Sequence, residues 1–442
     1  MFSIKGSHLN ISASELEEKV KDIACRLSGV VSKNRVALYV DTSPDGIVLL
    51  LAAMKLGLEI VLCSLREPAL VIDVWLKELG VHQIFYSGDG KIVEDISCFS
   101  CHISNLREFP KSNYQSKNNF STIMRTSGST GAPKNAVISS KAHKASAQEV
   151  SRYFKYEPTS CWLLSLPLYH VSGFSVVMRA LYARASVYLL AMGESLTSSK
   201  KFWPVSHCSV VPAQVKKLLS AAVDLSNLNA VIVGGDGLNT QDQKEALKRR
   251  WPLFETYGMT ESASMIWSNA SSPLSGSLPH AQVLLAHDGE ILVKGESLFE
   301  GYIKDGQIFS SLTSGGFFAT GDIGKIDDHN RLQIIGRKNN RIISGGENIQ
   351  AEEVERILEQ HPSIEACVVL GISDESYGKR PMAFIKWYQN KCEQEKIAVW
   401  LEKYLARYKC PKFFFDWPCD IAFESKKPRH ALALRLKLMD LE

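Results

Sequence analysis

A short stretch rich in glycine, hydroxyl and lysine side chains is the part of the sequence best suited to bind a polyphosphate. Its residues are Thr126-Ser127-Gly128-Ser129-Thr130-Gly131-Ala132-Pro133-Lys134. Glycines let the backbone approach a ligand and expose N–H groups, while hydroxyls and lysine supply further hydrogen-bond donors. The spacing differs from the Walker A pattern of Gly, four residues and Gly-Lys-Ser/Thr, which disfavours a P-loop kinase or GTPase. Without further support, the stretch fits an exposed turn equally well.

Further polar and glycine residues follow segments that read as short apolar strands. Ligands in parallel α/β sheets gather beyond the carboxyl ends of the strands, so these residues are well placed to form one site. They are His170, Ser172 and Gly173 after 162–166, Gly234 and Gly235 after 230–233, and Tyr257 to Glu261 after 254–256. Each of them alone also fits an ordinary loop or helix-start position.

Taken in order along the chain, these segments resemble the signature motifs of the adenylate-forming enzymes, a family of acyl-CoA synthetases, peptide-synthetase adenylation domains and luciferases. The resemblance runs from Thr126 to Gln350 and continues more weakly near Arg429, whereas residues before Asn118 carry no motif. It implies that ATP activates a carboxylic acid as an acyl-adenylate, and that the acyl group then passes to the thiol of coenzyme A. It also implies Mg²⁺ as the metal cofactor.

The resemblance assigns the nucleotide to the large N-terminal part of the chain. The residues matched to ATP are Thr126, Ser127, Gly128, Ser129, Thr130, Gly131 and Lys134 for the phosphates, and Gly234, Gly235, Tyr257 and Gly258 for adenine. Thr260 would contact the α-phosphate, and Glu261 would bind Mg²⁺, which prefers carboxylate and phosphate oxygens. Asp322 would accept hydrogen bonds from the ribose hydroxyls, with Arg337 beside it. Asn135 and Asp236 depart from the family pattern.

The acid and the thiol are assigned in the same way. His170 would lie against the acyl group and help to orient the acid, with Ser172 and Gly173 beside it. Gly345 and Gly346 would let the backbone approach the pantetheine arm of coenzyme A. Asn339 stands at the hinge position of the family, where Asp or Lys is usual.

A catalytic lysine is expected near the C-terminus, because two anionic reactants need positive charge as the pentavalent phosphorus forms. The family pattern is Gly-Lys, two residues, Arg. Ser425-Lys426-Lys427-Pro428-Arg429 fits it with Ser for Gly, which favours Lys426 and leaves Lys427 as the fallback. A second alignment puts Ala433-Leu434 at the Gly-Lys position, so that the lysine would be missing. A basic run at a chain end is also often merely solvated.

The identity of the acid is suggested by Arg179, which stands in an otherwise apolar helix just after His170. A buried charge needs a partner, and an Arg fork binds a carboxylate with two hydrogen bonds. The motifs resemble most the o-succinylbenzoate–CoA ligases of menaquinone synthesis, whose acid has a second carboxylate. An exposed Arg179 would remove this argument. The alternatives are another aryl or fatty acid–CoA ligase, a carrier-loading adenylation enzyme, and, in a different class, a non-catalytic nucleotide-binding sensor.

The elements that must position these residues follow an α/β order. Apolar strands alternate with helical segments up to residue 233, which predicts parallel sheets with crossover helices. Short strands parted by Gly and Asp from 282 onward predict a small antiparallel region. A mobile α+β domain would follow, so the predicted domains are 1–337 and 338–442. Helices are predicted after a capping box (Ser12 with Glu15, or Ser14 with Glu17) and over 46–58, 351–359 and 393–408.

Composition narrows the class of protein further. The chain has 442 residues, 45% of them hydrophobic and 22% charged, with a net charge of +4, which fits a globular enzyme and argues against general nucleic-acid binding. Neither a membrane span nor a secretory signal is visible, and the scattered cysteines suit a reducing cytoplasm. Cys98-Phe99-Ser100-Cys101-His102 matches a haem-attachment pattern, but no export signal supports it. Whether the chain forms a homo-oligomer is left open.

Overall fold

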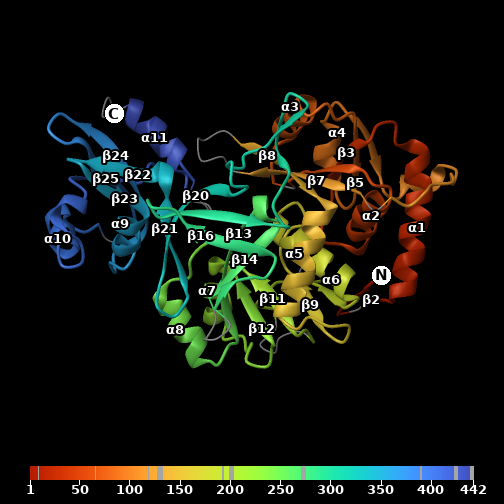
Figure 1. The fold of residues 1–442 in the computed structure, drawn as a ribbon, viewed down its shortest axis with the longest axis horizontal. Helices are drawn as coiled ribbons and strands as arrows, with labels where there is room; N and C mark the ends of the chain where they lie inside the picture. The colour runs from red at the N-terminus through yellow and green to blue at the C-terminus, as the bar shows by residue number, and fades with distance from the viewer. Residues whose placement is uncertain are drawn as a thin grey trace.

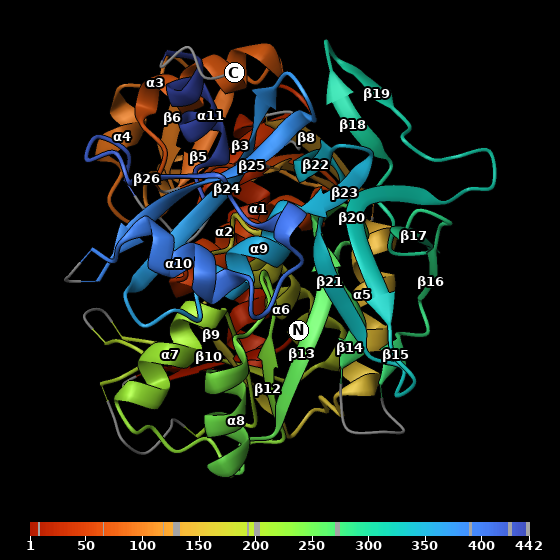
Figure 2. The same cartoon turned by 90° about the vertical axis from the view of Figure 1, so that its left-hand side faces the viewer.

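The computed structural model describes residues 1–7, 9–64, 66–117, 119–126, 133–191, 194–198, 204–269, 275–388, 391–422 and 427–438. These residues form a large lobe and a smaller C-terminal lobe that lies at its side (Figure 1). Figure 2 views the small lobe face-on, in front of the large one. No helix of the described residues combines the length and the apolar character that a membrane crossing requires.

Two mixed, mostly parallel sheets build the large lobe. The first has the order β19 (Gln307–Phe309), β18 (Gly301–Lys304), β8 (Lys134–Ser139), β7 (Ser121–Thr126), β4 (Glu59–Leu62), β3 (Arg35–Tyr39), β5 (Gln83–Tyr86), β6 (Phe99–His102). The second has the order β15 (Gly276–Ser277), β14 (Ser264–Asn269), β13 (Leu253–Met259), β12 (Ala230–Val233), β11 (His207–Val210), β9 (Cys161–Leu164), β10 (Ser186–Leu189), β1 (Ser3–Gly6), β2 (Leu9–Ile11).

Helices between and outside these sheets complete the large lobe. One continuous core joins apolar residues of both sheets to the helices α1 (Ala13–Val30), α2 (Pro44–Lys55), α5 (Ser140–Tyr153) and α6 (Val171–Ala183). The other helices are α3 (Ala69–Glu78), α4 (Lys91–Glu94), α7 (Pro212–Ser220) and α8 (Thr240–Lys248). Helix α1 begins at the predicted capping box, in which Glu15 N–H donates to Ser12 Oγ and Glu15 Oε2 accepts from Ser12 N–H.

The remaining sheets lie toward the C-terminus. The predicted antiparallel region is the sheet β16 (Ala281–Leu285), β17 (Glu290–Gly295), β20 (Phe318–Ile326), β21 (Leu332–Arg337). The small lobe contains β23 (Glu347–Gln350), β22 (Arg341–Ser344), β25 (Gly378–Trp387), β24 (Ile364–Asp374) and β26 (Phe413–Asp416), with the helices α9 (Ala351–Leu358), α10 (Gln394–Leu401) and α11 (Arg429–Leu438). The exact domain limits, 1–337 and 338–442, stay predictions.

Three predicted element limits differ most from the structure. The helix expected over 46–58 ends at Lys55, and the helix expected over 393–408 ends at Leu401. The chain must turn after Leu401, because β26 returns to pair in parallel with β25. The third difference concerns the motif at Tyr257, expected to follow a strand. Strand β13 runs through it to Met259, because β14 pairs with β13 and extends it.

Candidate active site

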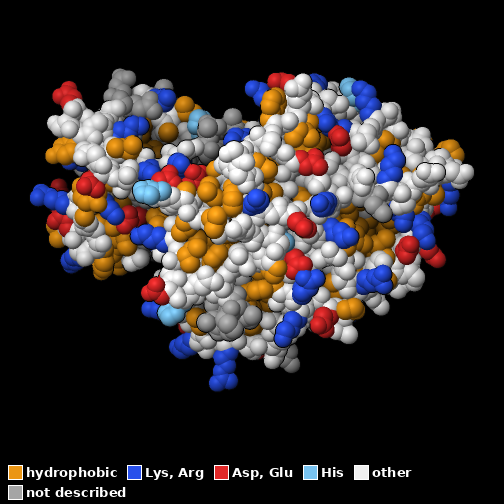
Figure 3. All heavy atoms as spheres, in the orientation of Figure 1, with side chains coloured by type: hydrophobic (Ala, Val, Ile, Leu, Met, Phe, Trp, Pro, Cys, Tyr) orange, Lys and Arg blue, Asp and Glu red, His pale blue; other side chains and the backbone are white. Residues whose placement is uncertain are grey.

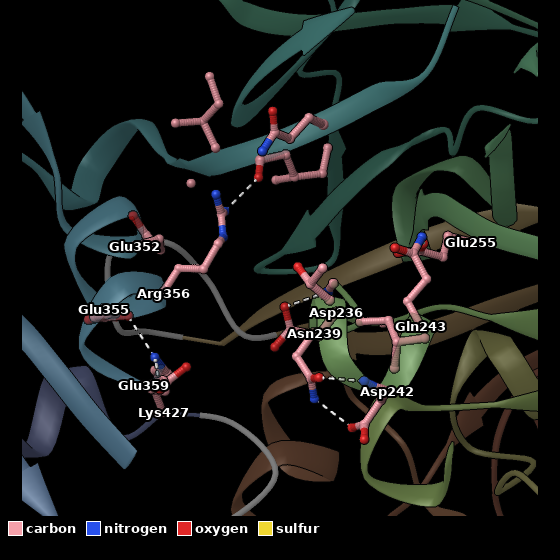
Figure 4. A pocket seen from close by; sticks show the side chains of 18 of the residues that line it. Asp236, Asn239, Asp242, Gln243, Glu255, Glu352, Glu355, Arg356, Glu359 and Lys427 are labelled. Atoms are coloured by element: carbon pink, nitrogen blue, oxygen red, sulfur yellow. Dashed lines mark hydrogen bonds and ion pairs between the residues drawn. The ribbon is translucent and has the colours of Figure 1, made fainter. Parts of the chain in front are cut away.

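A cleft of about 2930 Å³ separates the two lobes. Figure 3 shows the groove at the junction of the lobes, with acidic and basic side chains on its small-lobe side. The large lobe lines it with residues after β12, with β13 and with the β20–β21 hairpin, and the small lobe lines it with α9 and residues 427–431. In Figure 4, Asp236 and Glu255 lie on one side of this cleft, and Glu352, Glu359 and Lys427 lie on the other.

Tyr257, Asp322 and Arg337, three of the residues matched to the nucleotide, meet in the cleft. The Tyr257 hydroxyl donates to Asp322 Oδ2 at 2.8 Å, and Arg337 Nε lies 2.7 Å from Asp322 Oδ1. Asp322 and Arg337 are opposite each other in the antiparallel pair of β20 and β21, which fixes their contact. Burial raises the pKa of Asp322, although the Arg337 charge opposes this. Each carboxylate oxygen keeps a lone pair, so ribose hydroxyls could still donate to Asp322.

The glycine turn after β12 lies next to β13. A side chain on Gly234 would approach Thr256 Oγ1 to 3.2 Å, and Gly235 has a φ of +88°, which favours glycine. Asp236 Oδ1 accepts from the backbone N–H of Gly237 at 2.8 Å. Asp236, which departs from the family pattern, therefore stabilises the turn in which it lies.

Gly258 and Glu261 owe their positions to an irregular turn at the end of β13. The pairing of β13 with β14 shifts its register between Tyr257 and Gly258, and a side chain on Gly258 would lie only 2.1 Å from Ser264 O. The strand then enters a short 3₁₀ turn, Thr260–Ser262. Thr260 and Glu261 are thus held directly beyond the end of Tyr257's strand.

Glu261 is buried and is contacted by a residue that the motifs did not identify. The hydroxyl of Tyr302 donates to Glu261 Oε1 at 2.7 Å, and the Lys134 ammonium lies 4.8 Å from the centre of the Tyr302 ring. Burial and the neighbouring Glu261 raise the pKa of Tyr302, so its hydroxyl keeps the proton that it donates. The carboxylate of Glu261 is the donor type that suits Mg²⁺. No sequence signal pointed to Tyr302, because it lies 41 residues from Glu261.

The ends of the glycine-rich loop are fixed by an antiparallel pair. Thr126 and Lys134 are partners at the ends of β7 and β8, and Thr126 Oγ1 donates to Lys134 O at 3.4 Å. Asn135, the departure after Lys134, accepts from the indole N–H of Trp75 on α3 at 2.7 Å. This bond anchors the start of β8 to a helix. The predicted phosphate contacts Ser127, Gly128, Ser129, Thr130 and Gly131 lie outside the described residues.

The residues matched to the acid begin helix α6. His170 precedes its first turn, is exposed and has its ring centre 4.5 Å from that of Tyr169. Gly173 is required by packing, because a side chain there would lie 2.1 Å from Pro167 O. Ser172 O accepts from Ser175 Oγ at 3.0 Å. The helix therefore starts tightly against the loop that follows β9.

Arg179 of the same helix is buried, with 1% of its surface exposed. Its Nη2 donates to Ser264 Oγ at 2.8 Å, and its guanidinium lies 4.8 Å from the centre of a Trp162 ring. Its Nε has no hydrogen-bond partner, and no carboxylate of the described residues pairs with it. Burial lowers the pKa of Arg179 to about 9, which still leaves it charged at neutral pH. The structure therefore excludes an exposed position for Arg179. Such a position would have removed the argument for a second carboxylate on the acid.

The small lobe presents a buried ionic cluster to the cleft. Glu355 of α9, 1% exposed, accepts from Lys427 Nζ at 2.8 Å and from Arg429 Nη2 at 2.6 Å. Lys427 also pairs with Glu359 at 2.7 Å. Burial by itself would lower the pKa of Lys427, but Glu355 and Glu359 outweigh it and raise the value. Lys426 lies outside the described residues.

The two glycines matched to the thiol site are not brought to the cleft. Gly345 and Gly346 form the turn between β22 and β23, with φ values of +57° and +85°, and neither lines the cleft. Asn339 does line it, in the short 3₁₀ turn Lys338–Asn340 that connects the lobes. In this arrangement, residues 427–431 line the same cleft as the nucleotide residues, whereas the turn with Gly345 and Gly346 lies outside it.

Comparison with known proteins gives consistent matches over nearly the whole chain. Residues 3–303 match the family model described as AMP-binding enzyme, and residues 353–417 match its C-terminal domain. The 2-succinylbenzoate–CoA ligase of Escherichia coli K12 is 31% identical over 413 residues, which cover 92% of this chain and 89% of that protein. Its counterpart from Staphylococcus epidermidis is 29% identical over 434 residues, which cover 94% and 90%.

A solved structure is also similar throughout. Wild-type E. coli MenE with a bound m-phenylether-linked analogue of OSB-AMS is 27% identical, with a TM-score of 0.80 over 99% of this chain and 96% of that chain. This likeness confirms the predicted fold class, parallel βα-layered sheets with a small antiparallel region and a C-terminal α+β part.

Proposed function

The chain belongs to the AMP-binding enzyme family, whose adenylate-forming chemistry its motifs predict, and we propose that it is an ATP-dependent acid–CoA ligase that uses 2-succinylbenzoate. The observation that carries this choice of acid is the buried guanidinium of Arg179, which no described carboxylate neutralises. The second carboxylate of 2-succinylbenzoate would pair with it in a bidentate geometry. Two relatives, 31% and 29% identical, are named for the same activity, and the product would serve menaquinone synthesis.

In the first half-reaction, one carboxylate of the acid attacks the α-phosphorus of ATP and pyrophosphate leaves. Tyr257 and Asp322 hold the nucleoside, and Thr260 contacts the α-phosphate. His170 orients the attacking carboxylate, while Arg179 holds the other one. Binding both reactants in one cleft replaces a collision of two anions by an oriented, effectively unimolecular step.

The metal ion of this step would be held by Glu261. The carboxylate donor fits Mg²⁺ bound together with ATP, and Lys134, over the ring of Tyr302, would meet the phosphates. When bound, Mg²⁺ neutralises charge on the triphosphate and polarises it for attack. The chain's own contribution is to keep the Glu261 carboxylate oriented, through the hydrogen bond from Tyr302.

Lys426 is the lysine that would stabilise the pentavalent phosphorus. Its neighbour Lys427 is less suited to that role, because Glu355 and Glu359 already neutralise its charge. The ion pairs of Lys427 and Arg429 with Glu355 fix the start of α11 against α9 of the small lobe.

The second half-reaction transfers the acyl group to coenzyme A. The thiol attacks the acyl carbon of the mixed anhydride, and AMP leaves with the electrons of the broken acyl–oxygen bond. Because Gly345 and Gly346 do not line the cleft, the small lobe would have to rotate about the segment near Asn339 to bring them there. Such a change is a hinge motion of one domain against another.

Product analysis tests the proposal. The full chain would be incubated with ATP, Mg²⁺, coenzyme A and 2-succinylbenzoate, and AMP and the thioester would be identified by mass spectrometry. Benzoate, a fatty acid and an omission of coenzyme A serve as controls. We expect thioester formation with 2-succinylbenzoate far above that with the monocarboxylates. Turnover of a monocarboxylate with none of 2-succinylbenzoate would show that the acid is wrong, and no acid-dependent pyrophosphate exchange at all would favour a nucleotide sensor.

A further inference from the structure

Tyr302 connects two residues that belong to different parts of the nucleotide site. Strand β18 pairs antiparallel with β8, and Tyr302 is the partner of Ala136 in that pair. Lys134 is two positions along β8 from Ala136, so its ammonium can lie over the Tyr302 ring, 4.8 Å from the ring centre. On its other side, the Tyr302 hydroxyl reaches Glu261. One side chain therefore contacts both the lysine of the phosphate loop and the acidic residue matched to the metal.

The segment that carries Tyr302 holds Glu261 at two points. The backbone N–H of Phe299 donates to Glu261 O at 2.8 Å, and the Tyr302 hydroxyl donates to Glu261 Oε1 at 2.7 Å. The first bond fixes the main chain of Glu261, and the second fixes the direction of its carboxylate. The hydroxyl bonds to Oε1 only. The second oxygen, Oε2, would therefore be left for a cation.

This arrangement has the physical character of a support for a metal ligand. Carboxylates that bind metals are commonly hydrogen-bonded by a second residue, which fixes their orientation before the ion arrives. A hydrogen bond to a charged acceptor is also stronger than one between neutral groups. The ring of Tyr302 is held by its edge contact with Phe299, at 4.9 Å between ring centres, so the hydroxyl cannot easily swing away from Glu261.

We propose that Tyr302 is a positioning residue for the magnesium–ATP complex. Its hydroxyl orients Glu261 toward the cation, and the face of its ring holds Lys134 beside the phosphates. The attraction of an ammonium to an aromatic face is independent of the hydroxyl, so the two roles can be separated by substitution. This inference rests on the proposed use of ATP and Mg²⁺ by the chain.

Two substitutions distinguish the roles. Tyr302→Phe removes the hydroxyl and keeps the ring under Lys134, whereas Tyr302→Leu removes both. Tyr404→Phe is the matched control, because Tyr404 is exposed on the small lobe and its ring contacts Trp400 there. Mn²⁺ is the probe for the metal, because its free concentration can be read by electron paramagnetic resonance in the presence of α,β-methylene-ATP. Binding of ATP alone is measured by calorimetry in EDTA.

For Tyr302→Phe we expect Mn²⁺ to bind about 10-fold more weakly, as is usual when a residue supporting a metal ligand is removed, with binding of metal-free ATP unchanged. For Tyr302→Leu we expect both to weaken. Each variant is also melted with and without Mn²⁺ and the nucleotide, because the shift is measured against the variant's own ligand-free midpoint. A variant of lower stability would thus still report on the metal.

Two results would overturn the inference: unchanged Mn²⁺ affinity in Tyr302→Phe, or equal losses of Mn²⁺ and metal-free ATP binding in that variant. Failure of the use of ATP and Mg²⁺, on which this inference rests, looks different, because the wild-type chain itself would then bind no Mn²⁺–nucleotide complex. Failure of the ligase activity alone would appear as an absence of thioester from any acid, with the binding of that complex retained. An effect of Tyr404→Phe equal to that of Tyr302→Phe would also contradict the assignment.

Discussion

Replacing Arg179 with methionine should impair recognition of 2-succinylbenzoate without destabilising the folded chain. Among the described residues, the Arg179 guanidinium donates a hydrogen bond to Ser264 and stacks on Trp162. Replacing buried ion pairs by apolar residues of similar volume is often neutral or stabilising, and a buried charge without an ionic partner is costlier than a paired one. Methionine sulfur also packs well on an aromatic ring. We therefore expect the unfolding free energy to change by less than about 1 kcal/mol or to rise.

Although the fold should be as stable or more stable, binding of 2-succinylbenzoate should become weaker. In the variant, the second carboxylate of 2-succinylbenzoate would enter a buried position with no cation to meet it, which costs about 3 to 5 kcal/mol. At about 1.4 kcal/mol per factor of ten, kcat/KM for this acid should fall between about a hundred- and a few-thousand-fold. Benzoate lacks that carboxylate, so its kcat/KM should change little.

The assay compares AMP release with 2-succinylbenzoate and with benzoate for the wild type, Arg179→Met and Arg152→Met. Arg152 is the matched control, because it lies on the neighbouring helix α5 with 73% of its side chain exposed. Unfolding is followed in denaturant for all three proteins. Equal losses for the two acids, or an unchanged preference for 2-succinylbenzoate, would refute the reasoning that Arg179 meets the second carboxylate.

Three further expectations follow from the structure. Lys426→Ala should lower adenylate formation about 10²- to 10³-fold and spare thioester formation from supplied adenylate, whereas a loss specific to the first step in Lys427→Ala would transfer the role to that residue. Asp322→Asn should raise the KM for ATP about 10-fold, since hydrogen bonds to a charged acceptor are lost, and an unchanged KM in pyrophosphate exchange would contradict the ribose contact. Burial lowers the pKa of His143 from 6.5 to about 3, so the stability that its neutral form gives is complete above pH 6.5 and is lost as the pH falls toward 3. In His143→Gln, the slope of unfolding free energy against pH in that range should decrease by up to about 1.4 kcal/mol per pH unit, and an unchanged slope would show that other groups control it.

Local signals in the sequence predicted much of the fold. The capping box at Ser12 and Glu15 marked the start of α1, and the apolar strand 230–233 was found with its observed limits, because caps and periodic apolar runs depend on neighbours along the chain. The family motifs also placed Tyr257, Asp322 and Arg337 in one site, and the structure brings them into contact. The lengths of α10 and β13 could not be found this way, because they depend on the pairing of β26 with β25 and of β14 with β13.

The sequence by itself determined the chemistry, since residue types and their order identify an adenylate-forming enzyme. Only the tertiary structure decided which charged residues are neutralised. Arg179 is buried and no carboxylate in the described part of the chain pairs with it, while Lys427, equally basic in the sequence, is held by Glu355 and Glu359. The role inferred for Tyr302 likewise depends on the pairing of β18 with β8, which the sequence did not reveal. The physical reason is that burial and ion pairing depend on residues distant along the chain, which no local pattern records.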